Sequence, residues 1–215
     1  MVNLTSPLYR APLVAALFFT AALHPPQSVL AKSKGNACTT CPVPGVNSQK
    51  TTSLGSARPG GPCQTGRASN GYPLPDPKCT PGAYNPTVTA AIFGNRRFTT
   101  KCVRDCLTDG ATKRTAYKNY SVKQTPSCEL EHLVPLEMGG ADSLVNIWPQ
   151  GGQAPDGKNY KDIKDQVESY LAIKILQGMD IETARKGIGS DWTQFIDAAQ
   201  TFCAANGCDI AKYRK

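Results

Sequence analysis

Two adjacent residues, Glu131 and His132, are the side chains of this chain best suited to hydrolytic chemistry. Hydrolysis of a phosphodiester needs a base that activates water and a cation that stabilises the developing charge. The imidazole of His132 has a suitable intrinsic pKa for the base. Glu131 is a hard oxygen ligand, suited to Mg²⁺ or Mn²⁺. Asn146, fourteen residues after His132, offers an amide oxygen that can orient the imidazole.

A strand, a loop and a strand must position these residues. The apolar runs Leu130–Leu136 and Leu144–Trp148 flank the turn signal Gly139-Gly140. Neighbours in a regular strand point to opposite faces, so Glu131 and His132 serve one site only if the strand ends or bends there. Pro135 allows such an end.

Helices are expected in the rest of the chain. Residues 160–177 carry a broad apolar face, and Gly178 stands at the place of a C-cap. Asp180 is expected to cap a second helix and Ser190 a third, which Asn206-Gly207 ends. Residues 87–93 predict one short helix or strand, and residues 98–128 predict short strand-like pieces with turns.

The segment around the acid–histidine pair resembles a known family. Residues 131–140 read EHLVPLEMGG, residues 146–150 read NIWPQ, and Lys164-Asp165, Glu168 and Asp191-Trp192 follow. This string is similar to an exported or phage-associated subset of the HNH nucleases, members of the ββα-metal or His-Me finger group. The resemblance covers about residues 73–204, and its long string is far more specific than the three-residue HNH signature.

The resemblance implies an α+β fold, with a small ββα-metal element and additional C-terminal helices. It implies a metal-dependent endonuclease that hydrolyses phosphodiester bonds of nucleic acid, with DNA favoured over RNA. His132 would deprotonate water and Asn146 would fix the imidazole. Glu131 would hold Mg²⁺ or Mn²⁺ together with Asp162, where related proteins often have His, or with its competitor Asn159.

Two departures from the family pattern motivate other hypotheses. Glu131 stands where the family has Asp, and the helix lacks the final His of the HNH triad. One alternative is therefore a catalytically inactive HNH-like protein that binds nucleic acid or another polyanion. Another is a cysteine-rich secreted interaction protein.

Other side chains have plainer interpretations. Trp148 and Trp192 are expected in the core. Lys164, Asp165 and Glu168 are expected to form a charge set on the helix surface, with Lys164 and Glu168 at i,i+4 spacing.

The formal net charge of +8 favours a polyanionic partner. The densest basic run is a candidate for phosphate contacts, although such runs are usually solvated faces. It comprises Arg96, Arg97, Lys101 and Arg104, with Lys113, Arg114 and Lys118 after it.

Residues 1–31 have the order of a secretory signal. Arg10 precedes the apolar run Ala11–Leu23, prolines follow, and Val29-Leu30-Ala31 offers a cleavage site. The run is too short to span a bilayer comfortably, so we expect export to the periplasm or the medium without stable membrane insertion. Cleavage removes Arg10 and no acid, which lowers the charge from +8 to +7, and leaves His132 as the single histidine.

Residues 32–72 are rich in Gly, Ser, Thr and Pro and contain no acid. This composition predicts a flexible basic leader with cysteines, before a nuclease-like domain at residues 73–215. All nine cysteines follow the cleavage site, so up to four disulfides and one thiol are expected. The Cys38–Cys41 spacing fits a zinc or redox pair, but export favours disulfides or a free thiol. Cys203–Cys208 is the best local pair.

Overall fold

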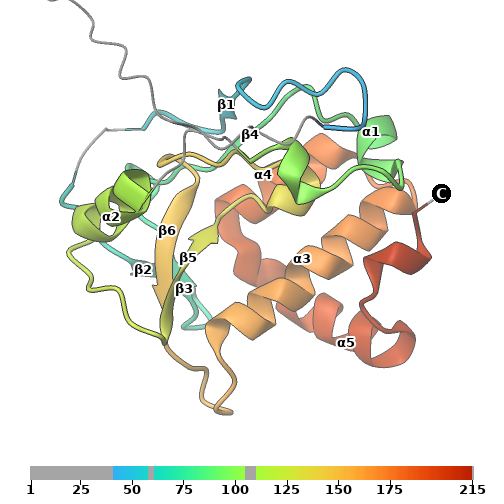
Figure 1. Cartoon of the computed structure of the whole chain (residues 1–215). Helices are drawn as coiled ribbons and strands as arrows, with labels where there is room; N and C mark the ends of the chain where they lie inside the picture. The colour runs from blue at the N-terminus through green and yellow to red at the C-terminus, as the bar shows by residue number, and fades with distance from the viewer. Residues whose placement is uncertain (1–40, 58–60, 105–109, 215) are drawn as a thin grey trace, which may run out of the picture. The chain divides into compact units, whose positions relative to one another are not determined.

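A computed structural model describes residues 41–57, 61–104 and 110–214 (Figure 1). The expected signal peptide, residues 1–31, lies outside these ranges. The described residues belong to one compact unit, Gly35–Lys215. They form an α+β fold, as expected, in which short antiparallel strand pairs lie beside five α-helices.

Three two-stranded sheets make up the β structure of the described residues. The strands β1 (Thr52–Ser53) and β4 (Ala83–Tyr84) pair, as do β2 (Gly66–Arg67) and β3 (Pro73–Leu74). The longest pair joins β5 (Cys128–His132) to β6 (Ile147–Gly151), with His132 opposite Ile147. The predicted strand–loop–strand is therefore confirmed, with the first strand earlier than its predicted run and the second three residues later than its run.

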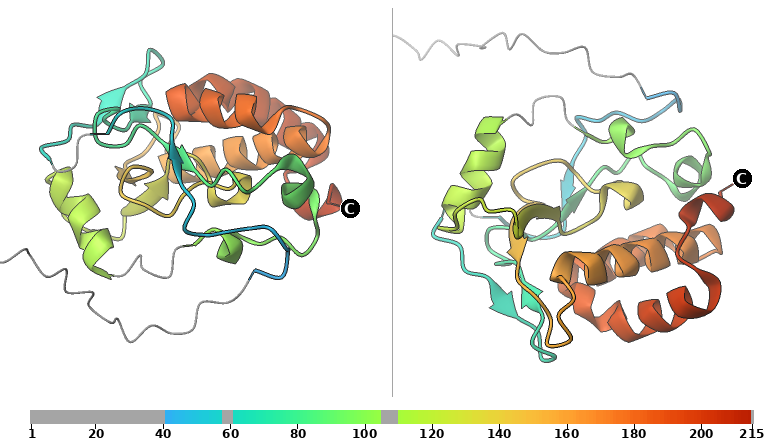
Figure 2. Two further views of the ribbon diagram at one scale, coloured as in Figure 1. Left: turned by 90° about the horizontal axis from the view of Figure 1, so that it is seen from above. Right: turned by 60° about the horizontal axis from the view of Figure 1, so that its bottom comes forward.

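The helices are α1 (Ala90–Gly94), α2 (Gly110–Asn119), α3 (Tyr160–Leu176), α4 (Ile181–Asp191) and α5 (Ile196–Asn206). α2 packs on one side of the β5–β6 hairpin and α3 on the other (Figures 1 and 2). α5 runs along α3 and covers the core on the side of α3 that faces away from the hairpin (Figure 2). In the described residues, no helix is long and apolar enough to cross a membrane.

The predicted helix at residues 160–177 matches α3, whose side chains Ile163, Val167 and Leu171 are buried. Trp148 and Trp192 are also fully buried, as expected. These apolar faces between the hairpin, α3 and α5 form the core. Their removal from water supplies the main driving force for this packing.

The predicted helix caps are confirmed in part. Asp180 caps α4 by accepting a hydrogen bond from the Thr183 N–H (2.8 Å), and Gly207 follows α5 with a positive φ. Ser190 does not begin a helix, because α4 continues through it to Asp191. The prediction for residues 98–128 missed α2, whose apolar residues are too few to produce a clear helical periodicity.

Disulfides join distant parts of the described chain. Cys41 pairs with Cys102 and Cys63 with Cys79, while the predicted Cys203–Cys208 pair is confirmed. Cys41 is therefore not half of a zinc or redox pair with Cys38, which lies outside the described residues. Cys128 is a free thiol, and burial raises its pKa.

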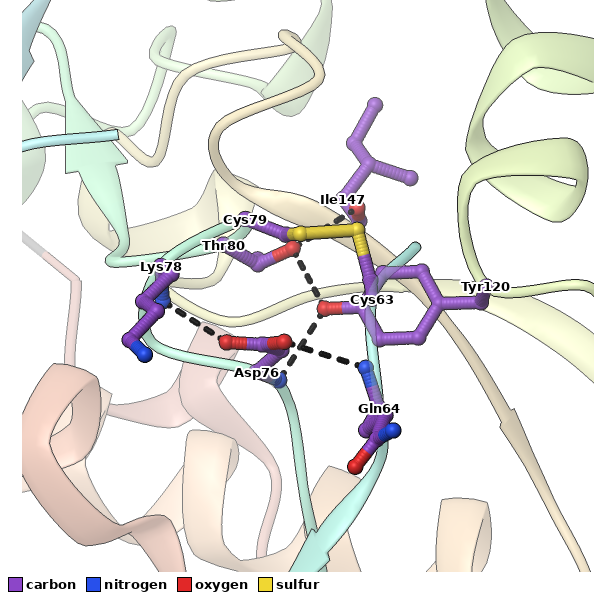
Figure 3. Close-up of a disulfide and its surroundings, with 8 residues drawn as sticks. All are labelled: Cys63, Gln64, Asp76, Lys78, Cys79, Thr80, Tyr120 and Ile147. Carbon is purple, nitrogen blue, oxygen red and sulfur yellow. Dashed lines mark hydrogen bonds between the residues drawn. A yellow bond between two sulfur atoms is a disulfide. The ribbon is translucent and has the colours of Figure 1, made fainter. Parts of the chain in front are cut away.

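A polar cluster surrounds the Cys63–Cys79 disulfide (Figure 3). The Tyr120 hydroxyl accepts a hydrogen bond from the Asp76 N–H (3.1 Å) and lies 2.8 Å from the Thr80 hydroxyl. Burial raises the pKa of Tyr120 to about 12. The cluster ties the segment after β3 to the residue that follows α2.

The described part of the expected leader, residues 41–57 and 61–72, departs from the expectation of a flexible tether. Cys41 and Cys63 bond to the rest of the domain, and Val43 is buried in its core. Two short strands, β1 and β2, pair with strands beyond residue 72. The composition is that of a linker, but covalent bonds supply the order that apolar burial alone does not.

Candidate active site

Glu131 and His132 line one cavity of about 790 Å³. The cavity lies among α2, the β5–β6 hairpin and α3, and its lining residues come from all three. His132 is the last residue of β5, so the alternation of strand side chains stops there. This strand end lets both neighbours serve one site, as the sequence requires.

A carboxylate holds the imidazole. The His132 Nε2 lies 2.9 Å from Asp142 Oδ1, and the side chains are only 15% and 8% exposed. A carboxylate only accepts, so this contact places the ring proton on Nε2 and leaves the lone pair on Nδ1. The pair therefore has the tautomer that a general base needs.

Asn146 does not orient the imidazole, contrary to our prediction. Its side chain is fully buried, and its Oδ1 accepts hydrogen bonds from the N–H groups of Ala83 (3.1 Å) and Val134 (2.9 Å). Its Nδ2 donates to the carbonyls of Val134 and Ala141, both at 2.9 Å. These four bonds use the full capacity of the amide, so Asn146 shapes the loop that carries Asp142.

Lys164 is in contact with both Glu131 and His132. Its side chain is 0% exposed, and its Nζ donates to the His132 carbonyl (2.8 Å) and to Glu168. Glu131 Oε1 is 3.7 Å from the same nitrogen. The expectation of a surface charge set was wrong for this lysine, although its predicted pairing with Glu168 is confirmed.

Burial and charge act against each other in this cluster. Burial alone lowers the pKa of Lys164, but Glu168 and Glu131 together raise the pKa above its ordinary value. Burial raises the pKa of Glu168, and Glu131 and Glu137 add to that rise against the attraction of Lys164. The raised pKa favours the charged form of Lys164, whose nitrogen lies between the Glu131 and Glu168 side chains.

The predicted metal ligands do not come together. Asn159 and Asp162 are exposed, lie outside the cavity lining, and bond to each other at 3.3 Å through Asn159 Nδ2. Glu131 alone of the three faces the cavity, where its Oε1 accepts the His132 N–H (3.1 Å). Across residues 41–57, 61–104 and 110–214, no cluster of three His, Cys, Asp or Glu side chains has a geometry that would hold a metal ion. The predicted ligands Asp162 and Asn159 therefore do not lie with Glu131 at the cavity.

Basic side chains from the segment before α2, from α2 and from α3 line part of the cavity, beside acids such as Glu129 and Asp165. Arg104, Lys113, Arg114 and Lys161 line the cavity, and we call these four residues the basic wall. Of the run predicted for phosphate contacts, only Arg104 belongs to it.

The other three residues of that run lie outside the lining. Arg97 and Lys101 are exposed. The Nε of Arg96 donates to the Arg214 carbonyl (3.1 Å), so this side chain binds the C-terminal end of the chain.

Two residues that position His132 were missed in the sequence. Asp142 follows the Gly139-Gly140 turn closely, and a carboxylate on such a tight return loop was a usable signal. Lys164 lies at helical spacing with Leu171 and Ile175, both buried, and this spacing placed it on the inward face of α3.

Comparison with known proteins gives no relative from which a function can be transferred. No family model, curated protein or solved structure matches the chain.

Proposed function

We propose that this chain is an exported nuclease that hydrolyses phosphodiester bonds of nucleic acid, with DNA favoured over RNA. One observation carries the proposal: the Asp142–His132 pair at the end of a β-hairpin faces a cavity that four basic side chains also line. The order of hairpin and helix is also that of the ββα element to which the sequence is similar.

The residues divide the reaction between them. Asp142 holds the Nε2 proton of His132, and Nδ1 accepts a proton from a water molecule that attacks the phosphorus. The new phosphorus–oxygen bond replaces the bond to the departing ester oxygen, which takes a proton from solvent. The basic wall attracts the phosphodiester and offsets the charge on its nonbridging oxygens.

A divalent ion stays a prediction from the family resemblance. Since Asn159 and Asp162 do not join Glu131, no step of the reaction is assigned to a metal here.

Export is part of the same proposal. Three disulfides among the described residues support an oxidising destination. The expected signal segment would deliver the chain there, to the periplasm or the medium.

The test is cleavage of plasmid DNA and of RNA by oxidised protein that lacks residues 1–31. We expect nicking by the wild type and a loss of roughly 10²-fold or more in His132→Ala. Lys174→Ala is the matched control, because Lys174 lies over the Tyr170 and Phe202 rings and not in the cavity. Equal cleavage by wild type and His132→Ala, at matched circular dichroism, would contradict the proposal.

The second candidate is a nucleic-acid-binding protein without turnover. The unassembled metal ligands favour it, because the basic wall would still hold phosphates. It predicts DNA retention that weakens steeply with salt, and no cleavage with Mg²⁺, Mn²⁺ or EDTA.

A further inference from the structure

The position of Lys164 carries an inference about the predicted metal site. The lysine lies on α3, whose buried face packs on the β5–β6 hairpin. Its ammonium is enclosed by three oxygens, from the Glu131 and Glu168 carboxylates and the His132 carbonyl. The Glu131 carboxylate comes from β5, the Glu168 carboxylate comes from α3, and the carbonyl belongs to His132 at the end of β5.

These three oxygens are the kind of donor set that a hard cation selects. Carboxylate and backbone carbonyl oxygens are preferred ligands of Mg²⁺, Mn²⁺ and Ca²⁺. An ammonium group carries three N–H donors and no acceptor, so it can satisfy the same oxygens. A second cation beside a buried ammonium would meet strong repulsion at this low local dielectric.

We propose that the Lys164 ammonium is a built-in cation, which occupies the place of a divalent metal ion between Glu131 and Glu168. Lys164 is then a positioning residue for the base. Its bond to the His132 carbonyl fixes the end of β5, and its charge attracts the Glu131 carboxylate, whose Oε1 is 3.7 Å away. Only the catalytic consequence rests on the proposed nuclease function; the exchange of ammonium for metal does not.

Removing the ammonium should turn this place into a metal site. Lys164→Ala leaves two carboxylates, one carbonyl and the space of the lysine side chain. We expect this variant to bind one Mn²⁺ per chain in isothermal titration calorimetry, and Mn²⁺ to raise its thermal midpoint by about 5 °C. Wild type and the control Lys174→Ala should bind none at this site.

A second substitution locates the bound ion. Adding Glu168→Gln to Lys164→Ala removes one carboxylate. The affinity of the double variant for Mn²⁺ should therefore be at least tenfold lower than that of Lys164→Ala. A wild-type protein that binds one Mn²⁺, with that binding lost in Glu131→Gln, would overturn the inference. A folded Lys164→Ala variant that binds no Mn²⁺ would overturn it as well.

Folding of the variant does not decide the test. If Lys164→Ala folds only in buffer that contains Mn²⁺, and not in metal-free buffer with EDTA, the ion has replaced the ammonium as expected. If it folds under neither condition, Mn²⁺ titration of the wild type still decides. None of these measurements uses turnover, so a protein that cleaves nothing would defeat the nuclease proposal and leave this inference standing.

Discussion

The positive charges around the cavity occur in two settings. The basic wall is solvent-facing, and its residues on α2, Lys113 and Arg114, are exposed. Lys164 on α3 is fully enclosed, with three oxygens around its nitrogen. In the proposed function, the exposed charges bind the substrate, whereas the buried charge of Lys164 holds the oxygens around it in place.

Removing an enclosed polar group should have a different effect from removing an exposed one. An enclosed group leaves unpaired partners when it is removed, so its loss lowers stability or misplaces the base. An exposed cation leaves only water behind, so its loss weakens binding and little else. The four predictions below test this division, in order of decreasing effect.

The largest effect is expected at Asp142, which is 8% exposed and holds the imidazole. Asp142→Asn offers an amide to Nε2 and no longer fixes the tautomer, so cleavage should fall by roughly 10²–10⁴-fold. Steady-state assays on plasmid DNA measure the loss. A variant with unchanged kcat would remove Asp142 from the mechanism.

Asn146 should affect stability most. Asn146→Ala breaks four buried hydrogen bonds, three within the loop between β5 and β6 and one to Ala83 on β4, and should lower the free energy of unfolding by about 3 kcal/mol. Urea unfolding at neutral pH gives the value. A loss below about 1 kcal/mol would mean that the loop holds its shape without this amide.

The basic wall should act through binding alone. Replacing Lys113 and Arg114 with alanine should weaken DNA binding about tenfold and reduce the slope of log affinity against log salt by about 2. The matched control, Arg97→Ala with Lys101→Ala, removes two charges outside the cavity. An equal loss in both double variants would indicate a general charge effect and no defined basic wall.

Tyr120 gives the smallest effect, with a defined pH dependence. Tyr120→Phe removes a buried hydroxyl that contacts Asp76 and Thr80, at a cost of about 1 kcal/mol. The folded pKa is raised from 10.0 to about 12, so wild-type stability is full below pH 10 and declines as the pH rises toward 12. The difference between wild type and variant should therefore shrink over this window in urea titrations. A constant difference would contradict the raised pKa.

The sequence predicted the elements that follow periodic or capping patterns. The helix at residues 160–177 and the cap at Asp180 were found because apolar spacing and side-chain caps are local signals. The hairpin was found because the Gly139-Gly140 turn divides two apolar runs. The short helix α2 carries no such pattern, and packing against the hairpin forms it.

The site was predicted less completely, for reasons of geometry. Glu131 and His132 were found by residue type, and the structure brings them to one cavity. Asp142 and Lys164 reach His132 across the loop and from α3, distances that no local pattern encodes. Two α3 side chains lie differently from the prediction. Asp162, predicted to hold a metal ion, is exposed outside the cavity, and Lys164, predicted on the helix surface, is buried.

Chemical rescue tests the role of His132 most directly. His132→Gly leaves a space at the cavity wall, and added imidazole can supply the missing base there. The account predicts plasmid cleavage that is lost in this variant and recovers roughly tenfold or more with imidazole, while wild-type cleavage does not rise. Plasmid cleavage by His132→Gly at the wild-type rate without imidazole would contradict the account.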